Sequence, residues 1–268
     1  MKKIIEIRDL SFEYGEHKVF EKFSLDIEDG SFYTVLGSNG SGKSTLTKII
    51  VGLEPSRGFV KIDGLFLNPK NIDEIRKVVS VVFENPDSQF ITESVEEELA
   101  FTLENLNYDK TEIVKRIREI AKKMGITHLL ERNPHELSGG EKQLVAFASA
   151  LIHDPKILIL DEALVMVDLV LRDKIYDILK EYHKKGLTIL NITHDSEESL
   201  LGTHVLIMNK GEIILNEKTK IALENDKAFK LGGMDLPFII DLSVKLKYYG
   251  IVSKTSFDSK KLVNAIWK

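Results

Sequence analysis

The sequence of 268 residues lacks cysteine entirely, carries no excess of positive charge and has no long apolar run. Without cysteine, disulfide bonds and thiolate metal sites are excluded. The 37 Lys and Arg side chains against 42 Asp and Glu give a net charge of −5, which argues against a nucleic-acid-binding surface. No apolar stretch approaches the ~20 residues that cross a bilayer. Charged Lys2, Lys3 and Glu6 break the N-terminus, so no signal peptide is expected.

The most informative stretch is residues 37–45, Gly-Ser-Asn-Gly-Ser-Gly-Lys-Ser-Thr, the G-x-x-x-x-G-K-S pattern of a phosphate-binding P-loop. An apolar run at 32–36 precedes it and a helical pattern at 46–52 follows, as strand–loop–helix geometry requires. Glycine lets the backbone close around a phosphate, and the amides of a helix N-terminus favour negative charge. We expect Lys43 to reach the β- and γ-phosphates and Ser44 to ligate Mg²⁺. The expected phosphate-binding set is Ser38, Asn39, Gly40, Ser41, Gly42, Lys43, Ser44 and Thr45.

Two carboxylates end a second apolar run, residues 156–162, Lys-Ile-Leu-Ile-Leu-Asp-Glu. Charge at the carboxyl end of a buried parallel strand is costly to bury and is usually functional. Asp161 suits Mg²⁺ binding through water, and Glu162 suits a general base for an attacking water. The alternative is a solvated strand end without chemistry.

His194 and the stretch Leu137-Ser138-Gly139-Gly140-Glu141 are further candidates. Ser138 is typical of a helix N-cap, and the glycines leave the helix amides bare, which predicts a second anion-binding helix start. His194 follows the apolar run at 187–192, where it either senses a γ-phosphate or is structural.

The remaining pattern predicts an α/β P-loop NTPase with an antiparallel β subdomain, a helical insert and a small C-terminal helical segment. Alternation at 3–12 and 20–27 indicates two strands, and Asp29-Gly30 predicts a hairpin turn into the P-loop strand. Buried parallel strands are expected at 78–83, 156–160 and 187–192. Helical patterns at 92–105 and 111–124 predict an insert at about 85–135. The nucleotide-binding domain is expected at 1–225 and the tail at 226–268, with Leu231-Gly232-Gly233 as a linker.

The order of P-loop, Leu-Ser-Gly-Gly-Glu, strand–Asp-Glu and strand–His resembles the nucleotide-binding subunit of an ABC transporter over residues 1 to about 225. This resemblance implies ATP binding, with Tyr14, otherwise readable as a core or turn aromatic, stacked on adenine. It also implies that Glu162 is the catalytic base and that His194 contacts the γ-phosphate and the attacking water. In the implied head-to-tail dimer, ATP on one P-loop meets Ser138, Gly139 and Gly140 of the other subunit.

Residues 82–90 and 94–101, with the tail motif Leu236-Pro237-Phe238, look like the ATPases of energy-coupling factor transporters. That likeness implies import of vitamins, Co²⁺ or Ni²⁺, a peripheral place on the cytoplasmic face of the membrane, and a tail that dimerises. The implied partners are a second ATPase, identical or different, a membrane scaffold subunit and a separate substrate-binding membrane subunit. Glu96, Glu97 and Glu98 are then a docking site for basic scaffold helices; the alternative is that they are solvated carboxylates favoured by the helix dipole.

The sequence departs from the family pattern at three positions. Glu84 stands where most ABC ATPases have a Gln that ligates Mg²⁺ and orients water, and a carboxylate there still suits Mg²⁺. Val165 replaces a usual Ser and Ser38 a usual Pro. Because of these departures, one alternative is that this chain is a partner subunit that binds ATP and hydrolyses it only weakly. A soluble ABC ATPase unconnected with transport is the other alternative.

Overall fold

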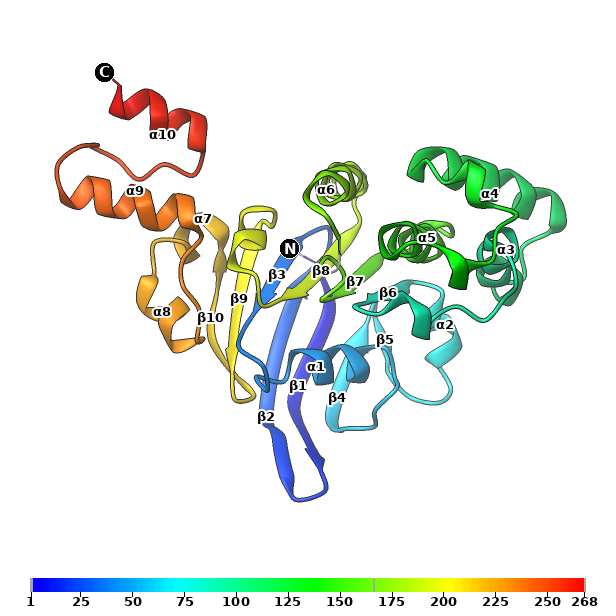
Figure 1. Cartoon of the computed structure of the whole chain (residues 1–268). Helices are drawn as coiled ribbons and strands as arrows, with labels where there is room; N and C mark the ends of the chain where they lie inside the picture. The colour runs from blue at the N-terminus through cyan, green and yellow to red at the C-terminus, as the bar shows by residue number, and fades with distance from the viewer. Residues whose placement is uncertain (1, 166, 268) are drawn as a thin grey trace.

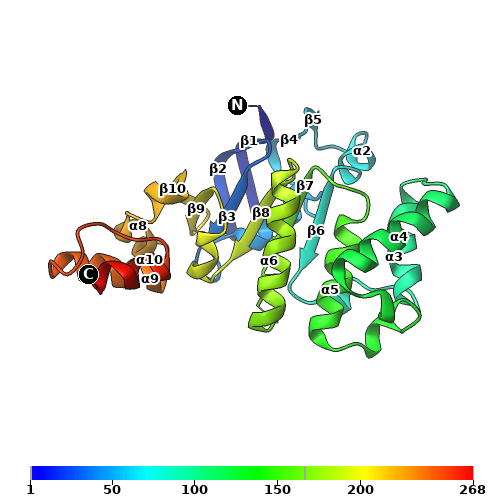
Figure 2. The same ribbon diagram turned by 90° about the horizontal axis from the view of Figure 1, so that it is seen from above.

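The structure, a computed structural model, describes residues 2–165 and 167–267. Three residues lie outside the described ones: Met1 and Lys268, at the outer ends of the predicted segments, and Met166, in the stretch after Glu162. Figure 1 shows two sheets with helices around them, and Figure 2 shows the same arrangement from above. Within the described part of the chain, no helix is both long and apolar enough to cross a membrane.

The first sheet is antiparallel, as the alternating sequence predicts. Its order within the described residues is β2-β1-β4-β5. The bounds are β1 Lys3–Tyr14, β2 His17–Glu28, β4 Arg57–Ile62 and β5 Leu65–Phe66. One face of β1 buries Ile5, Ile7 and Leu10.

The second sheet carries the P-loop and has the order β10-β9-β3-β8-β7-β6 within the described residues. The bounds are β3 Phe32–Leu36, β6 Val79–Phe83, β7 Ile157–Asp161, β8 Thr188–Thr193, β9 His204–Asn209 and β10 Glu212–Lys218. Its core strands β3, β8, β7 and β6 pair in parallel, and β9 pairs in parallel with β3. Strands β3, β7 and β8 are buried along their whole length, as expected for a parallel sheet covered on both faces.

The predicted hairpin between the second strand and the P-loop strand is wrong. β3 pairs in parallel with β8 and β9, whereas β2 pairs with β1 in the other sheet. The Asp29-Gly30 turn instead carries the chain from one sheet to the other. The Gly30 amide donates to Thr188 Oγ1 at 2.9 Å, and the Ile189 amide donates to the Ser31 carbonyl at 2.9 Å, so this turn is held against β8.

Helices cover both faces of the central sheet. The bounds are α1 Lys43–Ile50, α2 Ile72–Arg76, α3 Val95–Asn105, α4 Lys110–Met124, α5 Gly139–Leu151 and α6 Leu169–Lys184. Helix α1 and the antiparallel sheet share one apolar core with the central sheet, and α3 to α6 share another core on its opposite face. Short 3₁₀ turns lie at Pro86–Ser88, Thr127–Leu129, Pro134–Glu136 and Ser196–Leu200.

The tail follows β10 and contains α7 Thr219–Ala222, α8 Asp226–Leu231, α9 Phe238–Tyr248 and α10 Ser259–Ile266. It lies at the opposite end of the central sheet from α3 and α4 in both views (Figures 1 and 2). The stretch predicted as a linker is packed: the Gly232 carbonyl accepts a hydrogen bond from the Ser38 amide at 3.1 Å. Phe229, Leu236 and Ile240 join a third core with Leu36, at the end of the P-loop strand. The domain boundary near residue 225 stays a prediction.

Candidate active site

The P-loop joins β3 to α1 in the geometry that the motif predicts. Gly42 has φ +103°, a left-handed conformation that favours glycine, and the helix begins at Lys43. The Lys43 ammonium donates to the carbonyl oxygens of Gly37 at 2.6 Å and Ser38 at 3.2 Å. Burial lowers the pKa of Lys43, while the carboxylates of Glu162 and Asp161 oppose that shift. A buried cation beneath a loop of amides is an environment that a phosphate group complements.

A cavity of about 400 Å³ opens over this loop and brings together most of the predicted site. The carboxyl ends of β6, β7 and β8 meet at the same edge of the sheet as the P-loop, because their registers align Phe83 with Asp161 and Asp161 with Ile192. The exposed Glu84 lines the same cavity, on the loop after β6. The lining residues are Asn39, Gly40, Ser41, Gly42, Lys43, Ser44, Thr45, Glu84, Glu162 and His194.

Ser44 and Asp161, both predicted to serve Mg²⁺, are adjacent. The Ser44 hydroxyl donates to Asp161 Oδ1 at 3.0 Å. Burial raises the pKa of Asp161, and the hydrogen bond from Ser44 opposes the rise. One hydroxyl and one carboxylate fit Mg²⁺, which keeps several waters and takes phosphate oxygens as further ligands. Over residues 2–165 and 167–267, no cluster of three or more His, Cys, Asp or Glu forms a metal site by itself.

Glu162 and His194 come from neighbouring strands and form a hydrogen-bonded pair. The distance from His194 Nδ1 to Glu162 Oε2 is 2.7 Å. Because an ionised carboxylate only accepts hydrogen bonds, Nδ1 carries the proton and Nε2 is left as an acceptor or a second donor. Glu162 has φ +55°, and its amide donates to the Ile192 carbonyl at 2.9 Å, which ties the strand end to β8. The carboxylate is 14% exposed and the imidazole 53%.

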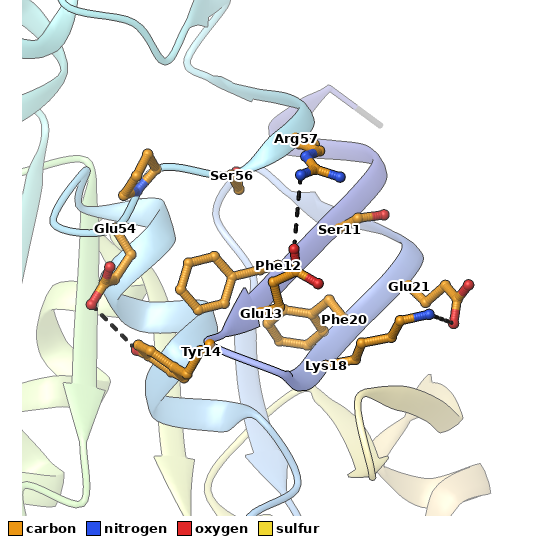
Figure 3. A pocket seen from close by; sticks show the side chains of 12 residues that line it. Ser11, Phe12, Glu13, Tyr14, Lys18, Phe20, Glu21, Glu54, Ser56 and Arg57 are labelled. Atoms are coloured by element: carbon orange, nitrogen blue, oxygen red, sulfur yellow. Dashed lines mark hydrogen bonds and ion pairs between the residues drawn. The ribbon is translucent and has the colours of Figure 1, made fainter.

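Tyr14 ends β1 and lines a second cavity of about 610 Å³ (Figure 3). Its hydroxyl donates to Glu54 at 3.3 Å, and its ring meets Phe12 edge-on at 4.8 Å between centroids. Phe20 also lines this cavity and reaches the P-loop, where its ring would lie 3.0 Å from a Cβ at Gly42. The aromatic cavity therefore adjoins the phosphate loop, as binding of a planar base beside its phosphates requires.

Ser138, Gly139 and Gly140 begin α5 and do not line the P-loop cavity of their own chain. The predicted N-cap is confirmed as a full capping box: the Ser138 hydroxyl oxygen accepts from the Glu141 amide at 3.4 Å, and Glu141 Oε2 accepts from the Ser138 amide at 2.9 Å. Glu141 Oε2 also accepts from the Ser138 hydroxyl at 2.6 Å. These hydrogen bonds hold the pKa of Glu141 below its ordinary value. The motif is thus a rigid, exposed helix start that lies apart from the P-loop within one chain.

Comparison with known proteins agrees with this geometry. Residues 20–165 match the family described as ABC transporter. Over 256 residues the chain is 38% identical to the energy-coupling factor transporter ATP-binding protein EcfA of Pediococcus pentosaceus, which covers 94% of this chain and 91% of that relative. The chain belongs to the ABC transporter family. Within it, the chain groups with the energy-coupling factor ATPases.

A further relative of this ABC ATPase is the energy-coupling factor protein EcfA1 of Mycoplasma pneumoniae, 37% identical over 96% of this chain and 93% of that relative. The fold matches a solved structure of cbiO1 from Clostridium perfringens, described as part of the ABC transporter complex cbiONQ. The TM-score is 0.78 at 29% identity, covering 93% of this chain and 98% of that one. The resemblance inferred from the motifs is confirmed.

Two polar side chains that the sequence analysis did not single out hold the loops of this ABC ATPase. Gln143, 1% exposed on α5, donates to the Ala163 carbonyl at 2.6 Å. Arg172 on α6 donates to the Leu164 carbonyl at 3.1 Å. Both residues lie on the helix faces that turn toward the core. A polar side chain among the apolar residues of such a face is the sequence pattern that could have identified them.

One of the three predicted docking glutamates is buried, unlike the other two. Glu98 is 5% exposed, and its Oε2 accepts from the Ile91 amide at 3.0 Å, the Thr92 amide at 3.2 Å and the Thr92 hydroxyl at 3.0 Å. This oxygen satisfies the amides of the preceding loop, although Glu98 also lines a groove beside α3. Glu96 and Glu97 are exposed in the first turn of α3 and remain available.

Proposed function

We propose that this chain is the ATP-binding and ATP-hydrolysing subunit of an energy-coupling factor importer. The observation that carries this proposal is the Glu162–His194 pair at 2.7 Å in the cavity above the P-loop lysine. Beside a triphosphate, a carboxylate can accept a proton from water and an oriented imidazole can contact the γ-phosphate. A protein that only binds nucleotide would need neither role.

In the proposed reaction, the amides of residues 38–45 and Lys43 bind the phosphates, and Tyr14 stacks on the adenine. Glu162 takes the proton of the attacking water as the bond between the γ-phosphorus and its bridging oxygen breaks. The Glu162 carboxylate holds His194 Nδ1, and a protonated Nε2 would donate a hydrogen bond to a γ-phosphate oxygen. Ser44 and Asp161 would hold Mg²⁺, with Glu84 beside them. The ion would neutralise charge on the phosphate oxygens.

The separation of Ser138, Gly139 and Gly140 from their own P-loop supports a head-to-tail dimer. A second ABC ATPase subunit, identical or different, would present this helix start to the γ-phosphate. The tail is proposed as a second dimer contact. Its exposed aromatic side chains support this, with Phe238 70%, Tyr248 86% and Trp267 84% exposed.

Coupling to the membrane is proposed at the first turn of α3. A groove of about 330 Å³ lies beside α3, and the apolar Ile91 and Phe101 line it together with Glu98. Glu96 and Glu97 are exposed in the first turn of the same helix. An apolar groove beside a helix that begins with acidic residues suits an amphipathic basic helix of a membrane scaffold subunit. The chain would then sit peripherally on the cytoplasmic face. A separate membrane subunit would select the vitamin or transition-metal ion.

Substitution of Glu162 by Gln tests the catalytic assignment. Glu162→Gln keeps the shape and removes the base, so ATP affinity should stay within about 2-fold while turnover falls by about 10²–10⁴-fold. The measurement is phosphate release and equilibrium ATP binding in the purified transporter complex. Glu119→Gln, the same change at an exposed position of α4, is the control and should leave both unchanged. Retained turnover in Glu162→Gln removes Glu162 as the base.

The transport assignment is tested by capturing the tagged chain from gently solubilised membranes and identifying its partners by mass. Recovery of a polytopic membrane protein with a second ATPase, or with this ATPase alone as a homodimer, supports an importer. Recovery without any membrane protein overturns the coupling to transport and leaves an ATPase with another output.

A further inference from the structure

The two loops that carry Glu162 and His194 are joined by a side chain outside the cavity. Arg172 lies in the first turn of α6. Its Nη2 donates to the Leu164 carbonyl at 3.1 Å, two residues after Glu162, and its Nη1 donates to Asp195 Oδ2 at 3.3 Å, one residue after His194. One guanidinium therefore spans both strand ends.

The helix that holds Arg172 is itself fixed at its start. Asp168 caps α6, and its Oδ1 accepts from the Val170 and Leu171 amides at 3.0 Å each. The Arg172 amide closes the first helical bond to the Asp168 carbonyl at 2.8 Å. The guanidinium is thus placed by a rigid element, whereas the groups it binds belong to loops.

Helix stability alone does not account for this residue. A cation in the first turn opposes the helix dipole, and the side chain is only 20% exposed. Among the described residues its Nε is buried without a hydrogen-bond partner. Arg172 also lines a cavity of about 500 Å³, together with His194, Asp195 and Val165.

We propose that Arg172 is a positioning residue for ATP hydrolysis, which holds the Glu162 loop and the His194 loop at the spacing that their hydrogen bond requires. The proposal rests on the proposed function and adds a residue to it. Arg172 does not contact the reacting atoms; it acts through Asp195 and Leu164. A planar fork reaches both acceptors at once, whereas a lysine has a single ammonium, no fork and a reach that is one atom shorter.

The first test is Arg172→Met, which keeps the apolar stem and removes the fork. We expect kcat of the assembled complex to fall by about 10- to 100-fold, because displacement of catalytic groups by about 1 Å has that effect. KM for ATP should stay within about 2-fold, since the phosphate and base contacts are untouched. Added guanidinium ion should restore part of the lost kcat, and Arg172→Lys should not restore full activity.

Arg116 on α4 provides a matched control. Its side chain is 22% exposed and also joins a backbone carbonyl, that of Ile152 at 3.0 Å, to a carboxylate, that of Asp154 at 2.8 Å. Arg116→Met removes a comparable bridge away from the cavity. It should lower the melting temperature to a similar extent while leaving kcat unchanged.

Two further readouts separate positioning from general damage. In a His194→Ala background, Arg172→Met should lower kcat by less than about 2-fold more, because both changes remove the same alignment. Nitrogen-15 NMR of the His194 ring, on the full chain, should show a protonated Nδ1 in the unsubstituted protein and in Arg116→Met, and a mixture of tautomers in Arg172→Met.

Unchanged kcat in Arg172→Met, an equal loss in Arg116→Met, or additive losses with His194→Ala overturn the positioning role. The NMR readout does not depend on turnover. If the unsubstituted complex hydrolysed no ATP, the proposed function would fail, and an unaltered His194 tautomer in Arg172→Met would still decide against Arg172 independently.

Discussion

Glu198 should make the stability of this ATPase fall as pH rises from about 4.5 to about 7. The side chain is 3% exposed in the turn after His194, and Asn191 donates to its Oε2 at 2.6 Å. Burial raises the pKa of Glu198 from 4.5 to about 7, and the hydrogen bond from Asn191 opposes this rise. The folded protein therefore holds the proton more tightly than the unfolded chain does. Its contribution is fully present below pH 4.5 and is lost progressively up to about pH 7.

The size of this loss follows from the two pKa values. At about 1.36 kcal/mol per pH unit, the interval from the ordinary pKa of 4.5 to about 7 corresponds to about 3 kcal/mol. Glu198→Gln keeps the volume and the oxygen that accepts from Asn191, and it removes the charge. We expect the variant to be more stable than the unsubstituted protein by about 1–3 kcal/mol at pH 8, and the difference to approach zero near pH 5.

The measurement is urea unfolding of both proteins at pH 5, 6, 7 and 8, monitored by circular dichroism. The slope m of the unfolding free energy against urea concentration should be the same for both proteins. Glu119→Gln, the same change at an exposed position of α4, is the matched control. A Glu198→Gln variant that is less stable at pH 8, or a difference that stays constant from pH 5 to 8, would refute the reasoning. Either result would mean that Glu198 is ionised in the fold at little cost.

Two pairs of substitutions test the packing of the fold. Leu103→Ala, in the core that α3 shares with α4 and α5, should cost about 3 kcal/mol of unfolding free energy, whereas Leu53→Ala, at 59% exposure, should cost under about 0.5 kcal/mol; equal losses in urea unfolding would contradict the core assignment. Gly211→Ala would set a methyl group against the Val19 carbonyl, so it should destabilise by more than about 2 kcal/mol, whereas Gly15→Ala, also at positive φ but with open space, should cost about 1 kcal/mol. Both are measured by thermal or urea unfolding, and indistinguishable losses would show that the strand edge yields to the methyl group.

Features with local causes could be predicted from the sequence alone. The P-loop consists of a strand, a glycine-rich turn and a helix start within a few residues. The spacing of its motif was therefore enough to predict the positions of Lys43 and Ser44. The Ser138–Glu141 capping box is equally local, since its partners are three residues apart. The strand ends that carry functional groups could also be predicted. An apolar run followed directly by charged residues indicates the carboxyl end of a buried parallel strand.

Contacts between strands and side chains that are far apart in the chain became visible only in the folded structure. The Asp29-Gly30 turn has the same local signal whether it closes a hairpin or passes between sheets, and contacts with Thr188 decided the outcome. In the sequence, Glu98 cannot be distinguished from Glu96 and Glu97. In the structure it is buried, because its carboxylate accepts hydrogen bonds from the Ile91 and Thr92 amides. Arg172 carries no motif, because its role depends on two loops that only the packing of α6 on the sheet brings within reach of one side chain. Local sequence specifies backbone conformation and caps, whereas pairing and burial depend on residues far away in the chain.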